Sequence, residues 1–537
     1  MPASTLLHDL PVLAARRTPA ARALSHGTVS LSYSELHADI DACAAGLLAL
    51  GVQRGDRVAV YLEKRFETVI ASFGAAAAGA VFVPLNPLLK PAQVAYVLHD
   101  SGARVLVTSP ERLALLALVD GGALRHIVVT DSAAPPAGAP GLPPSLERVH
   151  WPALLAAPPR AGHRVIDTDL AAILYTSGST GSPKGVVLSH RNLVAGARSV
   201  ASYLGNHPGD TLLAALPLSF DAGFSQLTTA FEAGARVVLL TPLLPRDVLR
   251  AIAAEQVTGL TAVPPLYIQL AALDWPAAAA TPLRYFANTG GRLPRDTLDA
   301  LRRKLPGAAP FLMYGLTEAF RSTFLPPAEI DRRPDSIGRA IPNAEVLVLR
   351  EDGSECGADE PGELVHRGAL VALGYWNDSV RTAERFRPLP PGLSGRPAGL
   401  PLPELAVFSG DTVRRDAEGF LYFVGRRDEM IKSSGYRVSP TEIEETVYAT
   451  GLVGECIAFG VDHPALGQAI QVLATPPAGT AVLDVAALTA QCRLRLPAYM
   501  VPAAIEALDL PLPRNPNGKI DRPRLRAEWA ARQAGAE

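Results

Sequence analysis

The sequence predicts an α/β protein with a large N-terminal domain of layered sheets and helices and a small α+β domain at the C-terminus. Its 537 residues are too many for one hydrophobic core, so at least two domains are expected. Short β-branched runs alternate with helix-length segments over most of the chain, which is typical of α/β layering. From about residue 425 this pattern changes, and we predict domains over residues 1–424 and 425–537.

Four β-branched runs in the N-terminal half indicate strands: RVAVYL (57–62), AVFVPL (80–85), RVLVTS (104–109) and HIVVT (126–130). The apolar run from Val69 to Leu85 is slightly short for a membrane span and contains Pro84. We interpret it as a buried helix that runs into a strand. The Pro-, Ala- and Gly-rich residues 131–168 predict a long surface connection, and residues 388–403 predict a loop or small insertion.

A helix-start signal opens the C-terminal part of the chain. In SPTEIEETVYATG (439–451), Ser439 is the predicted N-cap, Pro440 occupies the first helical position, and Glu442 follows three residues after the cap. Gly451 is the predicted terminator. Strand-like ECIAFGV (455–461) and AIQVLATP (469–476) and a helical LTAQCRLRL come next, which is enough for a separate small domain.

Composition excludes several classes of protein. Apolar residues make up 48% and charged residues 19%, as in globular proteins, and the net charge of −2 gives no reason to expect nucleic acid or an acidic membrane as partner. The four cysteines show no CxxC pair, which predicts neither a disulfide framework nor a zinc site and suits a reducing cytoplasm. The N-terminus lacks the pattern of a secretion signal, and no integral membrane segment is expected.

The segment DLAAILYTSGSTGSPKGVVLSHRNL (169–193) carries the strongest chemical signal. An apolar strand runs into a loop whose glycines allow tight turns, whose hydroxyls can donate hydrogen bonds, and whose Lys184 adds a positive charge. Such a loop can hold a polyphosphate. It is not the loop of P-loop kinases, because Pro183 stands where that motif requires glycine before the lysine. The candidate phosphate-binding residues are Thr176, Ser177, Gly178, Ser179, Thr180, Gly181 and Lys184.

With this loop the chain closely resembles the superfamily of AMP-forming adenylating enzymes, which comprises acyl-CoA synthetases, adenylation domains of peptide synthetases and luciferases. The motifs follow in the expected order from about residue 30 to 525. In NTGGRLPRDTLDAL (288–301), the resemblance implies that the backbone of Gly290, Gly291 and Arg292 borders adenine. The glycine pair precedes a helix with Leu298, Leu301 and Leu305 on one face.

YGLTEA (314–319) resembles the second nucleotide motif of the superfamily. The resemblance implies that Tyr314 stacks on adenine beside Gly315, that Thr317 touches the α-phosphate, and that Glu318 binds Mg²⁺. A carboxylate is a suitable ligand for this hard cation.

SGDTVRRDAEGFLYFVGRRDEMIKSSGYRVSPTEIE (409–444) is the next specific block. The resemblance implies that Asp411 binds the two ribose hydroxyls and Arg426 binds ribose or phosphate. Asp428 matches the hinge about which the small domain swings, and Lys432 would contact the nucleotide. Three residues would line the path of the incoming thiol: Ser434, Gly435 and Arg437.

Lys519 follows Asn-Gly in PLPRNPNGKIDRPRL (511–525). In the superfamily the matching lysine enters the active site during adenylation, where its charge would stabilise the carboxylate oxygen and the α-phosphate. The implied reaction joins a carboxylate to AMP from MgATP with release of pyrophosphate, and then transfers the acyl group to a pantetheine thiol. The implied cofactors are ATP, Mg²⁺, and coenzyme A or the phosphopantetheine of a carrier protein.

The acid is less well defined by the sequence. In ALPLSFDAGFSQL (215–227), many acyl-CoA ligases have Phe-His-x-x-Gly, whereas this chain has Phe220 and Asp221. Amino-acid adenylation domains often place Phe-Asp here, and the Asp holds the α-ammonium of the substrate. The alternative is that Asp221 caps a helix that starts at Ala222. Both a small carboxylic acid and an amino acid loaded on a separate carrier protein therefore remain open.

Other segments, such as LPRDVLRAI and HRGALVALGYWND, resemble the AMP-forming ligases associated with bacterial exosortase loci. An alternative of a different class is a non-catalytic nucleotide-binding protein. It predicts loss of a charged catalytic group, whereas Lys184, Glu318, Asp411, Arg426 and Lys519 are all present.

Overall fold

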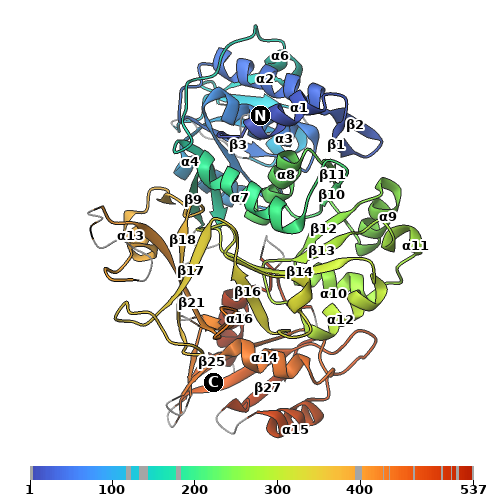
Figure 1. Cartoon of the computed structure of the whole chain (residues 1–537), viewed down its shortest axis with the longest axis vertical. Coiled ribbons are helices and arrows are strands. Elements are labelled where there is room, and N and C mark those ends of the chain that lie inside the picture. Colours follow the sequence, from blue (N-terminus) through green and yellow to red (C-terminus); the bar gives the residue numbers. More distant parts are fainter. Residues whose placement is uncertain are drawn as a thin grey trace.

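The computed structural model describes residues 4–116, 122–131, 143–176, 183–393, 399, 402–426, 429–433, 436–463, 466–496, 500–509, 511–515 and 519–534. They form two large sheets with helices packed on them and a smaller third sheet at the C-terminal end of the molecule (Figure 1). The predicted α/β fold is confirmed.

The first sheet has eight strands in the order β19-β9-β8-β4-β3-β5-β6-β7. The four predicted strands are confirmed as β3 to β6, which lie parallel to their neighbours because helices connect them. The strands are β3 (Arg57–Tyr61), β4 (Val81–Pro84), β5 (Ala103–Thr108), β6 (His126–Val129), β7 (Glu147–His150), β8 (Leu170–Thr176), β9 (Lys184–Ser189) and β19 (Gly374–Tyr375). The helices of this region are α2 (Tyr33–Ala49), α3 (Phe66–Ala78), α4 (Pro91–Ser101), α5 (Pro110–Leu113) and α6 (Trp151–Leu155).

The apolar run Val69 to Leu85 is a buried helix followed by a strand, as predicted. Helix α3 ends at Gly79, whose left-handed φ of 85° lets the chain reverse into β4. Within the described ranges, no helix is both long and apolar enough to cross a bilayer.

The predicted surface connection over 131–168 is wrong in part. It contains β7 and the short helix α6, whose Trp151 and Leu154 are buried in the main core. The two apolar side chains are three residues apart on one helical face, and Pro152 favours the first turn. This local signal competed with the Pro- and Gly-rich composition around it.

The second sheet has 14 strands and changes character along its length. Strands β10 to β14 are parallel, and from β15 onward the pairing becomes antiparallel. The strands are β1 (Arg22–His26), β2 (Val29–Ser32), β10 (Thr211–Ala214), β11 (Arg236–Leu239), β12 (Gly259–Ala262), β13 (Tyr285–Asn288), β14 (Ala309–Tyr314), β15 (Thr323–Leu325), β16 (Ser336–Ala340), β17 (Ala344–Leu349), β18 (Gly362–Gly368), β20 (Phe386–Pro388), β21 (Leu405–Arg415) and β22 (Leu421–Arg426).

Helices α7 and α8 pack on each other and share one large core with both sheets. Ser189 caps α7 through a capping box with Asn192, and this helix follows directly on strand β9. The helices around this sheet are α1 (Asp9–Arg17), α7 (His190–Leu204), α8 (Asp221–Ala233), α9 (Pro245–Glu255), α10 (Pro264–Ala272), α11 (Ala277–Ala280), α12 (Arg295–Lys304), the 3-10 turn η1 (Pro327–Glu329) and α13 (Ser379–Arg385). The predicted apolar face of α12 is confirmed, because Leu298, Leu301 and Leu305 are buried.

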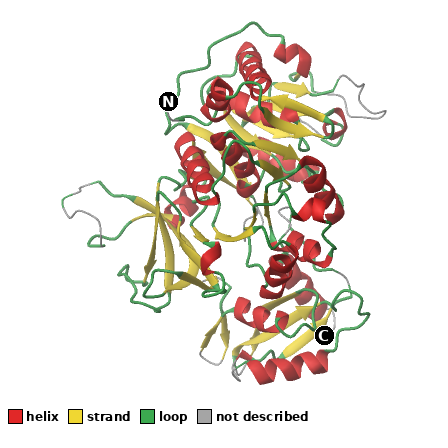
Figure 2. Ribbon diagram, turned by 45° about the vertical axis from the view of Figure 1, so that its right-hand side comes forward, coloured by secondary structure: helices red, strands yellow, loops and turns green. Residues whose placement is uncertain are grey.

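Strands from Ile431 onward form a separate five-stranded sheet with its own apolar core (Figure 2). It contains β23 (Ile431–Ser433), β24 (Tyr436–Val438), β25 (Cys456–His463), β26 (Gly467–Ala474) and β27 (Ala504–Ala507), with helices α14 (Pro440–Tyr448), α15 (Val485–Arg495) and α16 (Arg522–Ala534). The predicted cap of α14 is confirmed: the Ser439 hydroxyl accepts a hydrogen bond from the Glu442 amide, and Pro440 begins the helix. All four cysteines are buried and form no disulfide.

Gly223, in the first turn of α8, supports a packing prediction. A Cβ at this position would lie 1.8 Å from the carbonyl oxygen of Pro217, so the loop before α8 can close only over glycine. We expect Gly223→Ala to lower the free energy of unfolding by about 2 kcal/mol through overpacking. Gly307→Ala is the matched control, because a Cβ there meets no atom within 4 Å. Equal melting temperatures for the two variants would contradict the prediction.

Candidate active site

The site begins at the carboxyl ends of β13 and β14, which are parallel neighbours in the second sheet. The loop after β13 carries Gly290, whose φ of 76° is left-handed, and the Asn288 amide holds the turn by donating to the Gly291 carbonyl at 2.7 Å. Tyr314 ends β14. Parallel strands bring both predicted nucleotide motifs to one edge of the sheet, where ligands of α/β proteins usually bind.

Lys519 reaches this edge from the C-terminal part of the chain. A Cβ built on Gly290 would lie 3.4 Å from the Lys519 Cε and 3.9 Å from the Phe220 Cζ. Its loop is closed on Asn515, whose side chain accepts from the Lys519 amide at 3.0 Å, while the Asn515 amide donates to the Lys519 carbonyl at 2.8 Å. The predicted adenine loop, acyl segment and lysine therefore meet.

The Lys519 ammonium keeps access to solvent but has protein atoms on most sides. This loss of solvation lowers its pKa, and the negative charge of Asp221 opposes the change most strongly. The lysine thus lies within electrostatic range of a carboxylate from the acyl segment.

Glu318 is buried at the centre of a second cluster, with 7% of its surface exposed. It accepts a hydrogen bond of 2.5 Å from the Tyr375 hydroxyl, and its Oε1 lies 3.8 Å from the Lys184 Nζ. Lys184 also donates to the Tyr375 hydroxyl at 3.2 Å. Burial acts to raise the pKa of Glu318, but the charge of Arg385, the Tyr375 hydroxyl and Lys184 together hold it below its usual value. The carboxylate is therefore ionised at neutral pH and suited to a hard cation.

Asp411 is at the centre of a third cluster, on strands β21 and β22. It is the register partner of Arg426 across β21 and β22, and the Arg426 Nε lies 3.2 Å from its Oδ1. The Tyr314 hydroxyl donates to Asp411, and burial together with this carboxylate raises the tyrosine pKa far above its ordinary value. Three residues predicted from two separate motifs are thus in direct contact.

Asp221 is buried, with 6% exposure, and its Oδ1 has no hydrogen-bond partner among the described residues. Burial raises its pKa, opposed chiefly by the charge of Arg321. The expectation that Asp221 caps a helix beginning at Ala222 is wrong in position: α8 begins at Asp221 itself, and Phe220 is the N-cap residue. The carboxylate is therefore in the first turn, where the helix dipole favours it.

The remaining predicted residues that the structure describes lie on strands or directly after them. Thr176 and Lys184 are register partners that flank the phosphate loop, and Gly315 and Thr317 follow β14 beside Glu318. Lys432 and Arg437 are register partners on β23 and β24, where only their backbone is described. The predicted loop residues Ser177, Gly178, Ser179, Thr180 and Gly181, the predicted hinge Asp428, and Ser434 and Gly435 lie outside the described residues.

The Arg292 side chain forms two ion pairs. It pairs with Asp335 at 2.6 Å and with Glu445 on α14 of the C-terminal part. The contact ties the adenine loop to the small sheet in the same arrangement that brings Lys519 to Gly290.

Sequence reasoning missed three residues of this site: Tyr375, Arg385 and Arg321. Tyr375 lies in GYWND, within a segment that resembles the exosortase-associated ligases. Its neighbours in the sequence gave no sign that it would contact Glu318. Arg385 ends α13. Of the charges around Glu318, that of Arg385 lowers the pKa of the carboxyl group most strongly. Arg321 follows YGLTEAF and is buried, at 2% exposure.

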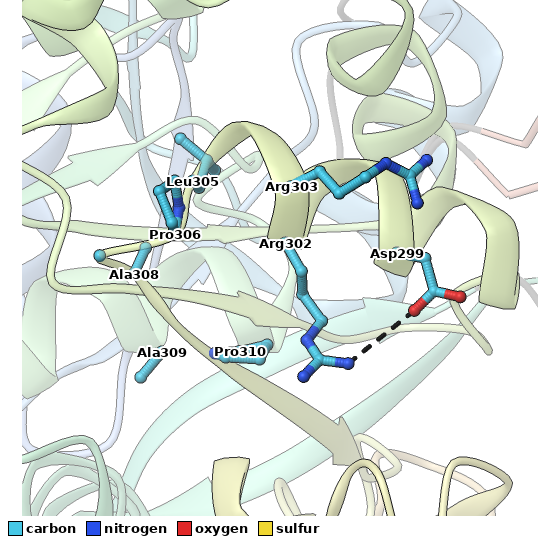
Figure 3. A pocket seen from close by; sticks show the side chains of 9 residues that line it. Asp299, Arg302, Arg303, Leu305, Pro306, Ala308, Ala309 and Pro310 are labelled. Atoms are coloured by element: carbon cyan, nitrogen blue, oxygen red, sulfur yellow. Dashed lines mark ion pairs between the residues drawn. The ribbon is translucent and has the colours of Figure 1, made fainter.

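An open groove elsewhere is not part of this site. It lies along the C-terminal half of α12 and the start of β14, where Arg302 and Asp299 approach each other (Figure 3). The strand residues that line it, Ala309 and Pro310, are at the end of β14 opposite to Tyr314, and none of the lining residues was predicted to bind the nucleotide.

The residues present fit a magnesium nucleotide. The ionised Glu318 supplies an oxygen ligand for Mg²⁺, Lys184 and Lys519 supply positive charge, and the half-exposed Arg426 with Asp411 supplies a donor and an acceptor for hydroxyls. The buried Asp221 belongs to the acyl segment and lies within electrostatic range of Lys519.

Comparison with known proteins gives the class. The model of the AMP-binding enzyme family matches residues 13–376, and the model of the AMP-binding enzyme C-terminal domain matches residues 442–519. The chain therefore belongs to the AMP-binding enzyme family. The resemblance inferred from the motifs is confirmed.

Relatives of several kinds match nearly the whole chain. Feruloyl-CoA synthase of Amycolatopsis sp is 32% identical and covers 96% of this chain and 97% of its own length. L-proline--[L-prolyl-carrier protein] ligase of Streptomyces coelicolor is 33% identical, covering 96% and 95%. A linear gramicidin synthase of Brevibacillus parabrevis is 31% identical over 97% of this chain, but the chain spans only 10% of that much longer protein.

Solved structures agree in fold. The anthranilate CoA ligase AuaEII with anthranoyl-AMP superposes with a TM-score of 0.87 at 24% identity, covering 100% of this chain and 99% of that one. O-succinylbenzoate coenzyme A synthetase of Bacillus subtilis with ATP and magnesium gives 0.78 at 27% identity, covering 96% and 99%. This chain is an AMP-forming acid–thiol ligase of the acyl-CoA synthetase type.

Tyr375 supports a prediction about pH. Its hydroxyl donates to Glu318 and helps to keep the pKa of that carboxylate low, so Tyr375→Phe should raise this pKa and move the acidic limb of the activity profile to higher pH. We also expect the rate to fall about tenfold, because a hydrogen bond to a charged group is lost. Pyrophosphate exchange measured against pH and Mg²⁺ tests this. Tyr422→Phe is the control, because Tyr422 donates to Asp416 outside the site. Identical pH profiles for wild type and Tyr375→Phe would refute the prediction.

Proposed function

We propose that this enzyme activates a small carboxylic acid as its acyl adenylate in the cleft between the second sheet and the C-terminal domain, and then forms the thioester of coenzyme A. The observation that carries the proposal is the convergence of Lys519, Gly290 and Phe220, which come from three predicted motifs. A positive charge placed where the mixed anhydride forms would stabilise the developing negative charge.

The roles of the other residues follow from their surroundings. Glu318 would hold the magnesium ion, because its carboxylate is ionised and faces Lys184. Asp411 would accept hydrogen bonds from the ribose hydroxyls, with Arg426 and Tyr314 fixing its position. Positioning and charge neutralisation then supply most of the acceleration, and no protein nucleophile is required.

The division into residues 1–424 and 425–537 is part of the proposal. The strands from Ile431 onward form their own sheet and core, and Lys519 belongs to that part. Rotation of the C-terminal domain about Asp428 would withdraw the lysine and admit the thiol, and such closure commonly sets turnover. The free, buried cysteines support a cytoplasmic location, and no nucleic-acid partner is proposed.

A second candidate is amino-acid adenylation followed by loading onto a separate carrier protein. The observation in its favour is the buried Asp221, whose Oδ1 could accept a hydrogen bond from an α-ammonium. An ammonium would also compensate the desolvated charge. Asp221→Asn, assayed with fatty, aryl and amino acids, separates the candidates. Loss of exchange with an amino acid only would favour the second one.

The central test is ATP–pyrophosphate exchange with Lys519→Ala. We expect the variant to lose roughly 100-fold or more of the exchange rate, because transition-state charge loses its partner. Thioester formation from a supplied acyl adenylate should fall much less, since the lysine acts in the first half-reaction. Lys90→Ala, at an exposed position, is the control. Exchange that survives in Lys519→Ala would overturn the assignment.

A further inference from the structure

A small buried cavity lies beside the proposed acyl site, between α7, α8 and strands β10, β12, β13 and β14. Its volume is about 20 Å³, which is room for one or two water molecules. Ala222, the residue after Asp221, lines it together with Ser225 and Thr229 of the same helix. The cavity therefore continues inward from the acyl segment.

Arg321 forms part of the cavity wall. Only 2% of its surface is exposed, and its Nε has no hydrogen-bond partner in the described part of the chain. Nor does any described carboxylate approach within ion-pair distance, although the ring of Phe320 lies 5.3 Å from the guanidinium carbon. A buried guanidinium with an unused donor is costly to the fold unless a ligand completes it.

The electrostatic interactions indicate the order in which Lys519, Asp221 and Arg321 lie. Asp221 is the carboxylate that acts most strongly on the Lys519 ammonium, and Arg321 is the cation that acts most strongly on Asp221. Asp221 thus lies near both, with the lysine toward the nucleotide cleft and the arginine toward the cavity. A substrate whose carboxylate lies at Lys519 would direct its other end toward Arg321.

The polar groups that surround the cavity differ in how well they are satisfied. Gln226 donates to the carbonyls of Leu213 and Thr261 and accepts from the Leu216 amide, so it serves the packing of α8. Arg321 and Asp221 instead each keep one buried atom without a partner among the described residues. An unbranched alkyl chain would leave both atoms unpaired, whereas a group with oxygen atoms would complete the arginine.

We propose that Arg321 selects the substrate, and that the acid carries a hydrogen-bond-accepting oxygen, as a hydroxyl, oxo or second carboxyl group, at the end away from the activated carboxylate. The small cavity has room for the oxygen-bearing group of the acid only. This inference rests on the proposed function, because it takes Lys519 as the group that meets the reacting carboxylate.

The test compares acids of equal length in ATP–pyrophosphate exchange: butanoic, 4-hydroxybutanoic and butanedioic acid, and the same three types with three, five and six carbons. Wild type should use at least one oxygen-bearing acid tenfold or more better than its alkyl counterpart. In Arg321→Met, the ratio of the exchange rate with the oxygen-bearing acid to the rate with its alkyl counterpart should fall by about 10- to 100-fold. Arg302→Met, in the open groove of Figure 3, should leave the ratio unchanged.

Two outcomes of the exchange assay overturn the proposal: equal or better use of the alkyl acids by wild type, or an equal loss with every acid in Arg321→Met. Melting of Arg321→Met provides a measurement that does not require activity. We expect a melting temperature equal to or above that of wild type, since an incompletely paired buried charge is removed. A fall of several degrees would mean that Arg321 serves the fold, which also overturns the proposal. Absence of exchange with every acid would count against the proposed function, and melting would still decide the role of Arg321.

Discussion

Three buried carboxylates, Glu318, Asp411 and Asp221, lie near the lysines of the site, and burying a carboxylate is costly unless a cation or a donor compensates it. Each is compensated by groups from elsewhere in the chain. Lys184 and Tyr375 face Glu318, and Arg426 pairs with Asp411 from the neighbouring strand. Asp221 depends on charges at longer range, from Arg321 and Lys519.

This distribution of charge links catalysis to the arrangement of the two parts of the molecule. Lys519 belongs to the C-terminal part. Its charge therefore acts on Asp221 only while that part packs against the predicted adenine loop. The ion pair between Arg292 and Glu445 joins the same two regions. Withdrawal of the lysine would therefore change the charge balance at the acyl segment as well as open the path for a thiol.

The imperfect pairing around Asp221 and Arg321 contrasts with the complete pairing around Gln226 on the same helix as Asp221. Helix α8 is secured by hydrogen bonds to three backbone groups, so its N-terminal turn can present a carboxylate with one unused oxygen. Groups left incomplete in an otherwise well-packed region are characteristic of binding sites, where stability is given up for recognition.

The sequence by itself determined the fold class, the strands β3 to β6, the cap of α14 and the family, because these depend on local periodicity, capping residues and contiguous motifs. It also predicted Lys184, Glu318, Asp411, Arg426 and Lys519 as site residues, since each lies within a recognisable segment. The helix α6 was missed because two apolar residues decide it within a Pro- and Gly-rich stretch. Only the tertiary structure decided that Tyr375 contacts Glu318 and that Arg321 is buried beside the acyl segment, because such contacts join residues whose local sequence carries no sign of their partners.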